Sequence, residues 1–316
     1  MKILVAPLNW GLGHASRCVP LVHRFLEDGH EVILGGDGDS LILLRKHFPT
    51  LRYVYLAPLN LRYSAGTRQV WAMLKAMPQL LRWAFRDHMM LKAVLKEEPF
   101  DRVVSDNRFG LYNKQVESIY ITHQLYIRLP KGWRWMEPIV AHWHARVYTR
   151  YNKVWIPDYS EMNRSLSGKL SHPSDMEYIG PLSRFSSFKK MQMQKSYYGI
   201  VAVLSGLEPQ RSILEAEIVN RYKGGTQTVL IIQGLMNRPN TRLKRGNITI
   251  VPYLNEKELV PALLQAEHII ARSGYSSIMD FEALGILDKC ELIPTPGQPE
   301  QEYLATFIAE KMQKNA

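Results

Sequence analysis

A stretch near the carboxyl end decides the fold: residues 270–285 read IARSGYSSIMDFEALG, and residues 293–303 read IPTPGQPEQEY. The first run predicts a buried strand, a turn of small residues at Ser273 and Gly274, and a helix that ends at Gly285. The second run predicts another strand and a polar loop that enters a further helix. A strand, a helix and a strand in this order form a parallel α/β unit.

The same alternation of short apolar runs and helical patterns continues through the rest of the chain. Strands are expected at residues 2–8, 30–36, 52–57, 101–105, 118–122, 153–156, 199–204, 228–233, 248–253, 268–271 and 291–293. The 316 residues exceed what one hydrophobic core usually supports. The predicted fold class is α/β, with two Rossmann-like doubly wound parallel-sheet domains that face each other across a cleft. We expect an N-terminal domain at 1–180, a C-terminal domain at 181–316, and a joint between His172 and Ser187.

The deciding stretch also carries groups that suit a nucleotide-sugar. The backbone amides of residues 274–277 open a helix, and a helix N-terminus favours an anion such as a diphosphate. Glu282 lies two turns into that helix and can accept hydrogen bonds from ribose hydroxyls. Gln298, Gln301 and Glu302 offer side chains to the hydroxyls of a sugar. We expect a nucleotide-sugar to bind here as a substrate, and no cofactor.

A glycine-containing loop follows the first predicted strand, where Gly11, Gly13, His14 and Arg17 stand in the order Gly-Leu-Gly-His-Ala-Ser-Arg. Parallel sheets bind ligands at this edge, so His14 is expected to face the interdomain cleft. A dinucleotide-binding fingerprint would need glycine where Ser16 stands. An oxidoreductase that uses a nicotinamide cofactor is therefore a weaker alternative, and a tight turn without a ligand is another.

Polar residues also follow two further predicted strands at the same edge. Asp106 and Asn107 come after the strand at 101–105, and His123 and Gln124 come after the strand at 118–122. Asp106 can orient His14 by accepting its ring N–H, which would raise the basicity of the imidazole toward an acceptor hydroxyl. A cap of the next helix is the alternative role of Asp106. We take His14 and Asp106 as candidate catalytic residues. The expected acceptor-binding residues are Gly11, Gly13, Arg17, Asn107, His123 and Gln124.

The motifs of the C-terminal half resemble those of the MurG-type N-acetylglucosaminyltransferases and of the wider glycosyltransferase family 28, which have the GT-B architecture. The resemblance covers most of residues 200–305 and extends to the Gly-x-Gly-His loop. It implies that Glu282 holds ribose, that Gly274 and Ser276 meet the diphosphate, and that Gln301 with Glu302 meets the transferred sugar. It also implies that the base lies against Leu254 beside an aromatic side chain. The full expected donor-binding set is Ser205, Gly206, Arg211, Tyr253, Leu254, Arg272, Ser273, Gly274, Tyr275, Ser276, Glu282, Gln298, Gln301 and Glu302.

The sequence departs from the MurG pattern at two places that matter for the donor. Glu208 and Pro209 stand in the first loop of the C-terminal half where that pattern has small residues. Glu302 replaces a second glutamine, which leaves the donor sugar open between N-acetylglucosamine and another hexose. No metal site is expected, because Asp37 and Asp39 fit a turn in which Asp39 or Ser40 caps a helix over 41–47.

The net charge of +11 is concentrated in the first half, where residues 60–154 hold 16 Lys and Arg against 7 Asp and Glu. Such a field favours anionic partners, among which an anionic membrane surface and phosphates fit better than nucleic acid. Residues 68–98 predict a long amphipathic helix with arginines on one face and Trp71 and Trp83 at its edge, a pattern typical of helices that lie on bilayers. Packing on the first sheet is the alternative for this helix.

No signal peptide follows Met1, and Cys18 and Cys290 show neither disulfide nor zinc spacing, so we expect a cytoplasmic protein, free or attached to the cytoplasmic membrane face. The predicted reaction is metal-independent, inverting transfer of a hexose from a UDP-sugar to the hydroxyl of an acceptor such as a lipid-linked or cell-envelope glycan. A nucleotide-sugar 2-epimerase on the same fold is the nearest alternative. A non-catalytic module that binds sugars or a membrane surface is the alternative from another class.

Overall fold

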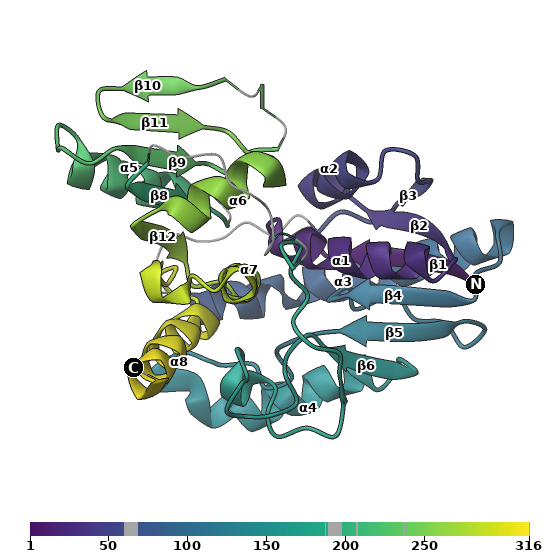
Figure 1. The fold of residues 1–316 in the computed structure, drawn as a ribbon. Coiled ribbons are helices and arrows are strands. Elements are labelled where there is room, and N and C mark those ends of the chain that lie inside the picture. The colour runs from purple at the N-terminus through teal and green to yellow at the C-terminus, as the bar shows by residue number, and fades with distance from the viewer. Residues whose placement is uncertain are drawn as a thin grey trace. The chain divides into compact units, whose positions relative to one another are not determined.

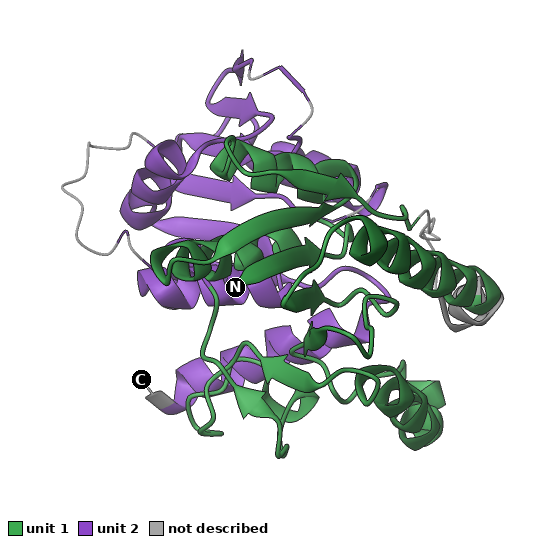
Figure 2. Cartoon of the chain, turned by 90° about the vertical axis from the view of Figure 1, so that its right-hand side faces the viewer, with its two compact units in different colours: residues 1–182 green, residues 183–316 purple. Residues whose placement is uncertain are grey.

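The computed structural model describes residues 1–59, 69–186, 188, 198–206, 208–236, 238–239 and 241–315. The chain divides into two compact units, which Figure 2 shows in two colours. Unit 1 spans Met1–Leu182, and unit 2 spans Ser183–Ala316. Each unit is built on its own parallel sheet, so each is described separately.

Unit 1 contains a seven-stranded sheet in which every pair of neighbouring strands is parallel. Its strands are β1 (Lys2–Pro7), β2 (Glu31–Gly36), β3 (Tyr53–Tyr55), β4 (Arg102–Asp106), β5 (Glu117–Ile121), β6 (Lys153–Ile156) and β7 (Glu177–Tyr178). They lie in the order β3-β2-β1-β4-β5-β6-β7. The direction of winding reverses between β1 and β4, and this is the place where doubly wound sheets bind ligands. Pro7 at the end of β1 pairs with Asp106 at the end of β4.

Helices cover both faces of this sheet, as Figure 1 shows for α1 on the near face and α3 behind it. The helices of unit 1 are α1 (Gly13–Glu27), α2 (Gly38–His47), α3 (Gln69–Glu97) and α4 (Glu137–Tyr148), with 3-10 turns η1 (Lys131–Met136) and η2 (Gly168–Leu170). Leu4, Ile33 and Val103 of the sheet pack with Leu91 of α3 in a buried cluster. The alternation of side chains along each strand supplies both helix layers with an apolar surface.

Unit 2 contains a six-stranded sheet with one antiparallel edge strand. Its strands are β8 (Ile200–Val203), β9 (Val229–Ile232), β10 (Leu243–Arg245), β11 (Ile248–Val251), β12 (His268–Arg272) and β13 (Cys290–Ile293), in the order β10-β11-β9-β8-β12-β13. Among the described strands of unit 2, only β10 runs antiparallel to its neighbour, β11. The helices are α5 (Gln210–Tyr222), α6 (Glu256–Gln265), α7 (Tyr275–Leu284) and α8 (Pro299–Asn315), with a 3-10 turn η4 (Leu287–Lys289).

Local sequence explains where several of these helices begin and end. The side chain of Asn255 accepts a hydrogen bond from the backbone N–H of Glu258, and Glu258 bonds back to Asn255, so a capping box starts α6. Gly285 ends α7 in the left-handed conformation with φ of 68°. On one face of the sheet, α5 buries Leu214 and Ile218 against the isoleucines and valines of β8, β9 and β11.

Every strand expected from the sequence is present, and two further strands are found. β7 spans two residues and β10 spans three, too few to show a pattern of alternation. β7 lies within residues 172–187, so the segment in which we expect the joint also contains a short strand. The prediction that Asp39 or Ser40 caps α2 is wrong, since the helix already begins at Gly38 and both residues lie in its first turn.

The helix predicted over residues 68–98 is present as α3, and Trp83 lies on its inward face. Trp83, expected at the edge of a membrane-facing surface, is buried and donates its indole N–H to the carbonyl of Ala57 at 2.8 Å. Asp87 and Leu91 follow at four-residue steps and are fully buried. The charge of Asp87 hid this face from a search for apolar periodicity. Trp71 lies outside the residues whose side chains the structure describes. None of the described helices is both long and apolar enough to span a bilayer.

Candidate active site

The ends of β1 and β4 bring His14 and Asp106 into direct contact. Gly11, with φ of 77°, turns the chain out of β1 in a conformation that favours glycine, and α1 starts two residues later. His14 therefore stands in the first turn of α1. Its Nδ1 lies 2.7 Å from Oδ1 of Asp106, the last residue of β4. The dyad expected from the sequence is thus formed within unit 1.

Arg17 lies directly beneath this pair. Three-residue spacing on α1 places it on the same helix face as His14. Its Nε donates to Oδ2 of Asp106 at 2.5 Å, its Nη2 donates to Oδ1, and its Nη1 lies 3.2 Å from Nδ1 of His123. The side chain is only 1% exposed. Burial and the bonds to Asp106 make the guanidinium a support for the carboxylate, and the contact of Arg17 with an acceptor stays a prediction.

The charges of this cluster set the protonation of both members of the pair. Burial tends to raise the pKa of Asp106, but the Arg17 guanidinium and His14 outweigh it and lower the pKa to about 2. Burial, followed by the positive charge of Arg17, lowers the pKa of His14. At neutral pH Asp106 is an anion that can only accept, so its 2.7 Å contact favours the imidazole proton on Nδ1. Nη2 of Arg17 can only donate and lies 2.9 Å from the same Nδ1, a contact that favours the other tautomer. In the tautomer that carries its proton on Nδ1, the lone pair of Nε2 is available to take a proton.

The other expected acceptor residues have different surroundings. His123 joins the cluster through Arg17 and is buried. Asn107 has φ of 60°, a strained value for a residue other than glycine, and its Oδ1 accepts the hydroxyl of Tyr120 at 2.6 Å. Gln124 is half-buried and bonds through its backbone N–H to Oγ1 of Thr122 at 3.1 Å. Residues 106–108 and 121–124 therefore meet at one edge of the sheet.

Arg108 is a buried arginine that binds several surrounding segments, and the sequence did not indicate this role. Its guanidinium forms a two-pronged pair with Asp87 of α3, at 2.9 Å and 2.8 Å, and donates to Asp37 at 2.9 Å and to the carbonyl of Ala57 at 2.7 Å. The arginine thus joins the loop after β4 to α3 and to the chain after β2 and β3. Asp37 also accepts from the side-chain amide of Asn9 at 3.1 Å.

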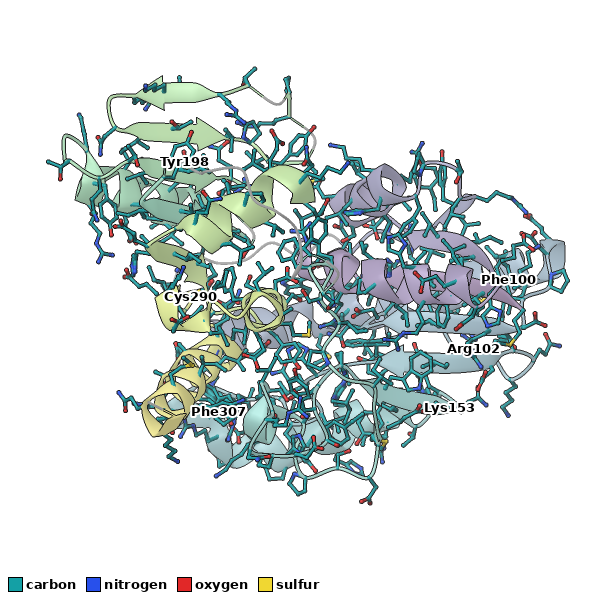
Figure 3. All side chains as sticks on the ribbon, viewed as in Figure 1. Phe100, Arg102, Lys153, Tyr198, Cys290 and Phe307 are labelled. Carbon is teal, nitrogen blue, oxygen red and sulfur yellow. The ribbon has the colours of Figure 1, made fainter. Side chains whose placement is uncertain are left out.

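The opposite edge of the unit 1 sheet has a different character. Figure 3 labels Arg102 and Lys153 where β4 and β6 begin. Both side chains pair with Glu117 of β5, at 2.7 Å and 2.9 Å. These are partly exposed ion pairs, which contribute little to stability and supply no activated group. The cluster of His14, Arg17, Asp106 and His123 therefore lies at the other edge of the sheet, where the strands end.

In unit 2, the loop after β12 is tied to its surroundings by two buried residues. Arg272 donates to the carbonyls of Pro294 at 3.1 Å and Gln210 at 2.8 Å. The hydroxyl of Ser273 donates to the carbonyl of Gln301 at 2.8 Å. Both side chains are buried, at 3% and 0% exposure, and their direct contact with a donor stays a prediction. They fix three loops at one edge of the sheet relative to one another.

Gly274, the residue before α7, has a feature that the protein's own packing does not require. Its φ of −73° and ψ of 141° are open to any residue, and a Cβ built on it would meet no described heavy atom within 4 Å. Its lack of a side chain leaves the start of α7 without a side-chain cap. An approaching ligand would use the space that a side chain would fill.

The loop after β13 is ordered by its own glutamines. Oε1 of Gln301 accepts the backbone N–H of Thr295 at 2.9 Å, and its Nε2 donates to Oε1 of Gln298 at 2.6 Å. Glu302 is exposed. The glutamines therefore shape this loop, and any contact that they make with a sugar comes in addition to these bonds.

Two carboxylates of α7 point in different directions. Glu282 is half-buried. Asp280 is buried, and its Oδ1 accepts the hydroxyl of Ser183 at 2.6 Å. Burial raises the pKa of Asp280 to about 6, even though the nearby Arg184 and the Ser183 hydrogen bond oppose this shift. Residues two apart on a helix lie about 200° apart around its axis, so α7 offers only one of these carboxylates to a given ligand.

The first loop of unit 2 is held by the residues that depart from the MurG pattern. Arg211 forms an ion pair with Glu208 and lies 3.4 Å from the carbonyl of Gln233. Glu208 also accepts from the hydroxyl of Ser212 at 2.9 Å at the start of α5. Ser205 and Gly206 precede this pair, the first half-buried and the second exposed. Tyr253 and Leu254, after β11, are both half-buried.

Sequence relatives extend over nearly the whole chain. An uncharacterized glycosyltransferase of Methanosarcina acetivorans is 24% identical, and the alignment covers 98% of this chain and 84% of that protein. An uncharacterized glycosyltransferase of Methanosarcina mazei is 23% identical, with the same coverage of both chains. No family model matches the sequence.

Solved structures of glycosyltransferases share the fold. Spinosyn rhamnosyltransferase SpnG matches with a TM-score of 0.55 and 14% identity over 99% of this chain and 92% of that one, and it has also been solved with thymidine diphosphate. Arabidopsis thaliana UGT89C1, complexed with UDP-L-rhamnose, matches with a TM-score of 0.54 and 14% identity over 99% and 92%. Acinetobacter baumannii MurG matches with a TM-score of 0.51 and 12% identity over 98% and 83%.

These comparisons define the class of protein. The chain has the GT-B fold of the nucleotide-sugar glycosyltransferases, with two parallel-sheet α/β units. Its full-length sequence relatives are glycosyltransferases, so the expectation drawn from the motifs of residues 270–303 is confirmed at this level.

Proposed function

We propose that the protein transfers a hexose from a UDP-sugar to an acceptor hydroxyl, by a single inverting displacement that needs no metal ion. The contact of 2.7 Å between His14 and Asp106 is the observation that carries this proposal. In the tautomer that donates Nδ1–H to Asp106, the neutral imidazole has a free lone pair on Nε2. A general base in this protonation state is what the activation of a hydroxyl requires.

In the proposed reaction, the acceptor oxygen attacks the anomeric carbon of the donor sugar. Its proton passes to Nε2 of His14, and the bond between the anomeric carbon and the diphosphate oxygen breaks. The electron pair leaves with UDP. Asp106 is a positioning residue, because it acts through His14: it fixes the tautomer and stabilises the imidazolium that forms.

The donor is proposed to bind unit 2 at the start of α7. The open space at Gly274 and the dipole of α7 suit the diphosphate, and preorganised donors at this position would stabilise the charge that develops on the leaving group. Glu282 would hold the ribose, and Tyr253 with Leu254 would contact the base. Gln298, Gln301 and Glu302 would meet the sugar.

A uracil base is the preferred assignment. It follows from the resemblance to the MurG type, and the shared fold of a protein complexed with UDP-L-rhamnose supports it. The thymidine diphosphate complex of SpnG makes thymine the competitor that a binding experiment must include. N-acetylglucosamine or another hexose is the proposed transferred sugar.

The acceptor is proposed to be a lipid-linked or cell-envelope glycan that the protein meets at an anionic membrane surface, on its cytoplasmic side. The supporting feature is a stripe on α3 made of Met77, Leu81, Phe85 and Met89, which recur every four residues and are 45% to 65% exposed. Arg82 and Arg86 lie next to the stripe and are also exposed. Apolar side chains flanked by arginines suit the boundary between headgroups and acyl chains of an anionic bilayer.

The donor assignment is tested by calorimetric titration of UDP, TDP, GDP and NAD into the wild type without added metal. UDP is expected to bind best. Gly274→Ala and Glu282→Ala should each weaken the binding of UDP at least about tenfold. The alanine side chain at position 274 would fill the space through which the diphosphate approaches, and Glu282→Ala removes the group that accepts hydrogen bonds from the ribose. Gly132→Ala is the matched control, since a Cβ at Gly132 also meets nothing within 4 Å.

Two results would overturn this assignment. One is the absence of UDP binding, and the other is binding that neither variant changes. Asp280→Asn separates the two carboxylates of α7: the proposal expects UDP affinity to stay within about twofold of the wild type, because Asp280 is buried against Ser183. Loss of affinity in Asp280→Asn but not in Glu282→Ala would move the ribose site to Asp280.

A further inference from the structure

Unit 2 contains a cavity that the proposed reaction does not use. Its volume is about 430 Å³, and it lies beside α5 against the strands β10 and β11 and the chain that follows β9. The sheet order places these strands on one side of β8, whereas β12, which leads to Gly274, lies on the other side. The cavity is therefore separate from the proposed donor loop at the start of α7.

The cavity exists because of the way in which β9 is connected to β11. In a doubly wound sheet, a helix normally links two neighbouring parallel strands and covers one face. Here the described part of residues 233–247, which lacks only 237 and 240, forms the edge strand β10 and no helix. The face beside α5 is left open, with Ile250 of β11 as part of its floor.

Three guanidinium groups line this cavity, from Arg211, Arg238 and Arg245. Arg211 is neutralised by its ion pair with Glu208. Arg238 and Arg245 are exposed at the rim, and within the described part of the chain neither side chain has an ion pair or a hydrogen bond. Two such arginines at one cavity suit a phosphate group, because a guanidinium can bind a phosphate through two parallel hydrogen bonds.

The remaining polar lining suits hydroxyl groups. The side-chain amide of Gln233 donates to Glu215 at 2.8 Å, which orients the carboxylate. Glu215 keeps lone pairs that can accept hydrogen bonds from hydroxyls. The Gln233 amide is held in place by Glu215 and can also form hydrogen bonds with hydroxyls. A carboxylate and an amide held beside apolar side chains are typical of sites that recognise polyhydroxylated ligands.

We propose that this cavity binds a phosphorylated sugar, with the phosphate at Arg238 and Arg245 and the hydroxyls at Glu215 and Gln233. The volume falls within the range of roughly 300–1,000 Å³ that small-molecule sites occupy. The proposed ligand has both a phosphate and hydroxyl groups. Phosphate alone would leave Glu215 without a hydrogen-bond donor from the ligand, and a neutral sugar would leave the two arginines without an anionic partner. Arg211, a member of the donor-binding set expected from the sequence, lines this cavity but is paired with Glu208. The proposed contacts with the phosphorylated sugar are made by other residues and do not depend on the donor site at the start of α7.

Arginine-directed labelling with phenylglyoxal, read by peptide mass spectrometry, tests the position of the ligand on the full chain. Glucose 6-phosphate should protect Arg238 and Arg245 and leave Arg242 labelled at its usual rate. Arg242 is the matched control, because it lies beside β10 but points to Glu258, 3.3 Å away, and does not line the cavity. Glucose without phosphate should protect none of the three.

Titration of the variants tests the chemistry. Arg238→Gln and Arg245→Gln should each weaken the binding of glucose 6-phosphate at least about tenfold, and Arg242→Gln should change its affinity less than about twofold. Glu215→Gln should weaken glucose 6-phosphate but not inorganic phosphate. Equal loss in Arg242→Gln, no protection at Arg238 and Arg245, or inorganic phosphate binding as tightly as glucose 6-phosphate would each overturn the proposal.

Discussion

Oδ1 of Asp106 lies 2.7 Å from Nδ1 of His14, although 92 residues separate the two in the sequence. The pairing of β1 with β4 brings them together, since Pro7 and Asp106 are partners in the sheet. The carboxylate is in turn held by Arg17, which is buried beneath it. An ionised acid under an imidazole that stays neutral is the arrangement that the proposed mechanism needs.

Replacing Asp106 by Asn should lower the rate of transfer by about 100- to 10,000-fold, because the amide no longer fixes the Nδ1–H tautomer of His14. The pH profile should change as well. Asp106 raises the pKa of His14, while burial and Arg17 lower it. The acidic limb of kcat/KM in the wild type is therefore expected below pH 6.5, and in Asp106→Asn it should move to still lower pH.

The matched control for this variant is Asp175→Asn, an exposed aspartate of the same unit, which should leave both the rate and the pH profile unchanged. A purely structural role of Asp106 predicts a loss of folded protein, seen by circular dichroism, and an unshifted limb in the protein that remains folded. That result would remove Asp106 from the mechanism.

Gly110 should tolerate no side chain. A Cβ at this position would lie 2.0 Å from the carbonyl oxygen of Ala84, which belongs to the backbone of α3. Neither backbone can yield without moving Arg108 away from Asp87, so Gly110→Ala is expected to lower the free energy of unfolding by about 1–3 kcal/mol or more. Urea denaturation measures this loss. Gly132→Ala, which meets no atom within 4 Å, should stay within about 0.5 kcal/mol of the wild type.

Asp280 should make the protein less stable as the pH rises from about 4 to about 6. Burial raises its folded-state pKa from 3.8 to about 6, so its contribution to stability is present below pH 3.8 and is lost as the pH passes the folded value. Asp280→Asn removes this titration. At pH 7.5 its free energy of unfolding should exceed that of the wild type by on the order of 1–3 kcal/mol, and the difference should vanish below pH 4.

Asp288→Asn, at an exposed position after the same helix, is the control for Asp280→Asn and should show no pH-dependent difference. Asp106 titrates in a separate window, because its folded-state pKa is lowered to about 2 and its contribution is lost only as the pH falls from about 4 toward 2. A stability difference for Asp280→Asn that is constant from pH 4 to 7.5 would contradict the assigned titration.

The apolar stripe of α3 should govern binding to anionic vesicles. Leu81→Ser combined with Phe85→Ser removes two side chains that are 64% and 65% exposed. Sedimentation with vesicles of equal parts phosphatidylglycerol and phosphatidylcholine should show at least about a tenfold loss of binding. Ile213→Ser with Leu243→Ser, two exposed apolar residues of unit 2, is the control and should bind as the wild type does. Equal binding of both double variants would argue against the stripe.

The sequence was sufficient to predict both sheets because apolar runs and glycine turns alternate with little ambiguity. It also indicated that His14 meets Asp106, since both follow strands that end at one edge of a parallel sheet. It could not show that Arg17 binds Asp106, because an arginine next to a glycine-containing loop resembles a ligand-binding group until its burial is known. The face of α3 was obscured in a similar way, since the inward Asp87 is explained only by Arg108, 21 residues later.

In unit 2, the sequence identified the loop after β12 but not which of its side chains bind other parts of the protein. Arg272 and Ser273 belong to the same motif as Gly274, and yet their side chains bind backbone carbonyls of other loops. Hydrogen bonds to backbone carry no sequence signal, because any residue supplies the partner. The cavity beside α5 was unforeseen for a related reason: β10 replaces a helix over only three residues.

The most direct test of the proposed reaction is UDP release from UDP-glucose and UDP-N-acetylglucosamine, followed together with the fate of the sugar, for the wild type and His14→Ala. We expect the wild type to release UDP and to transfer the sugar to water or an added hydroxyl acceptor. His14→Ala should lose at least about 100-fold in rate while its affinity for UDP stays within about twofold. Release of UDP by His14→Ala at the wild-type rate, or an epimerised donor sugar without its transfer, would contradict the proposed mechanism.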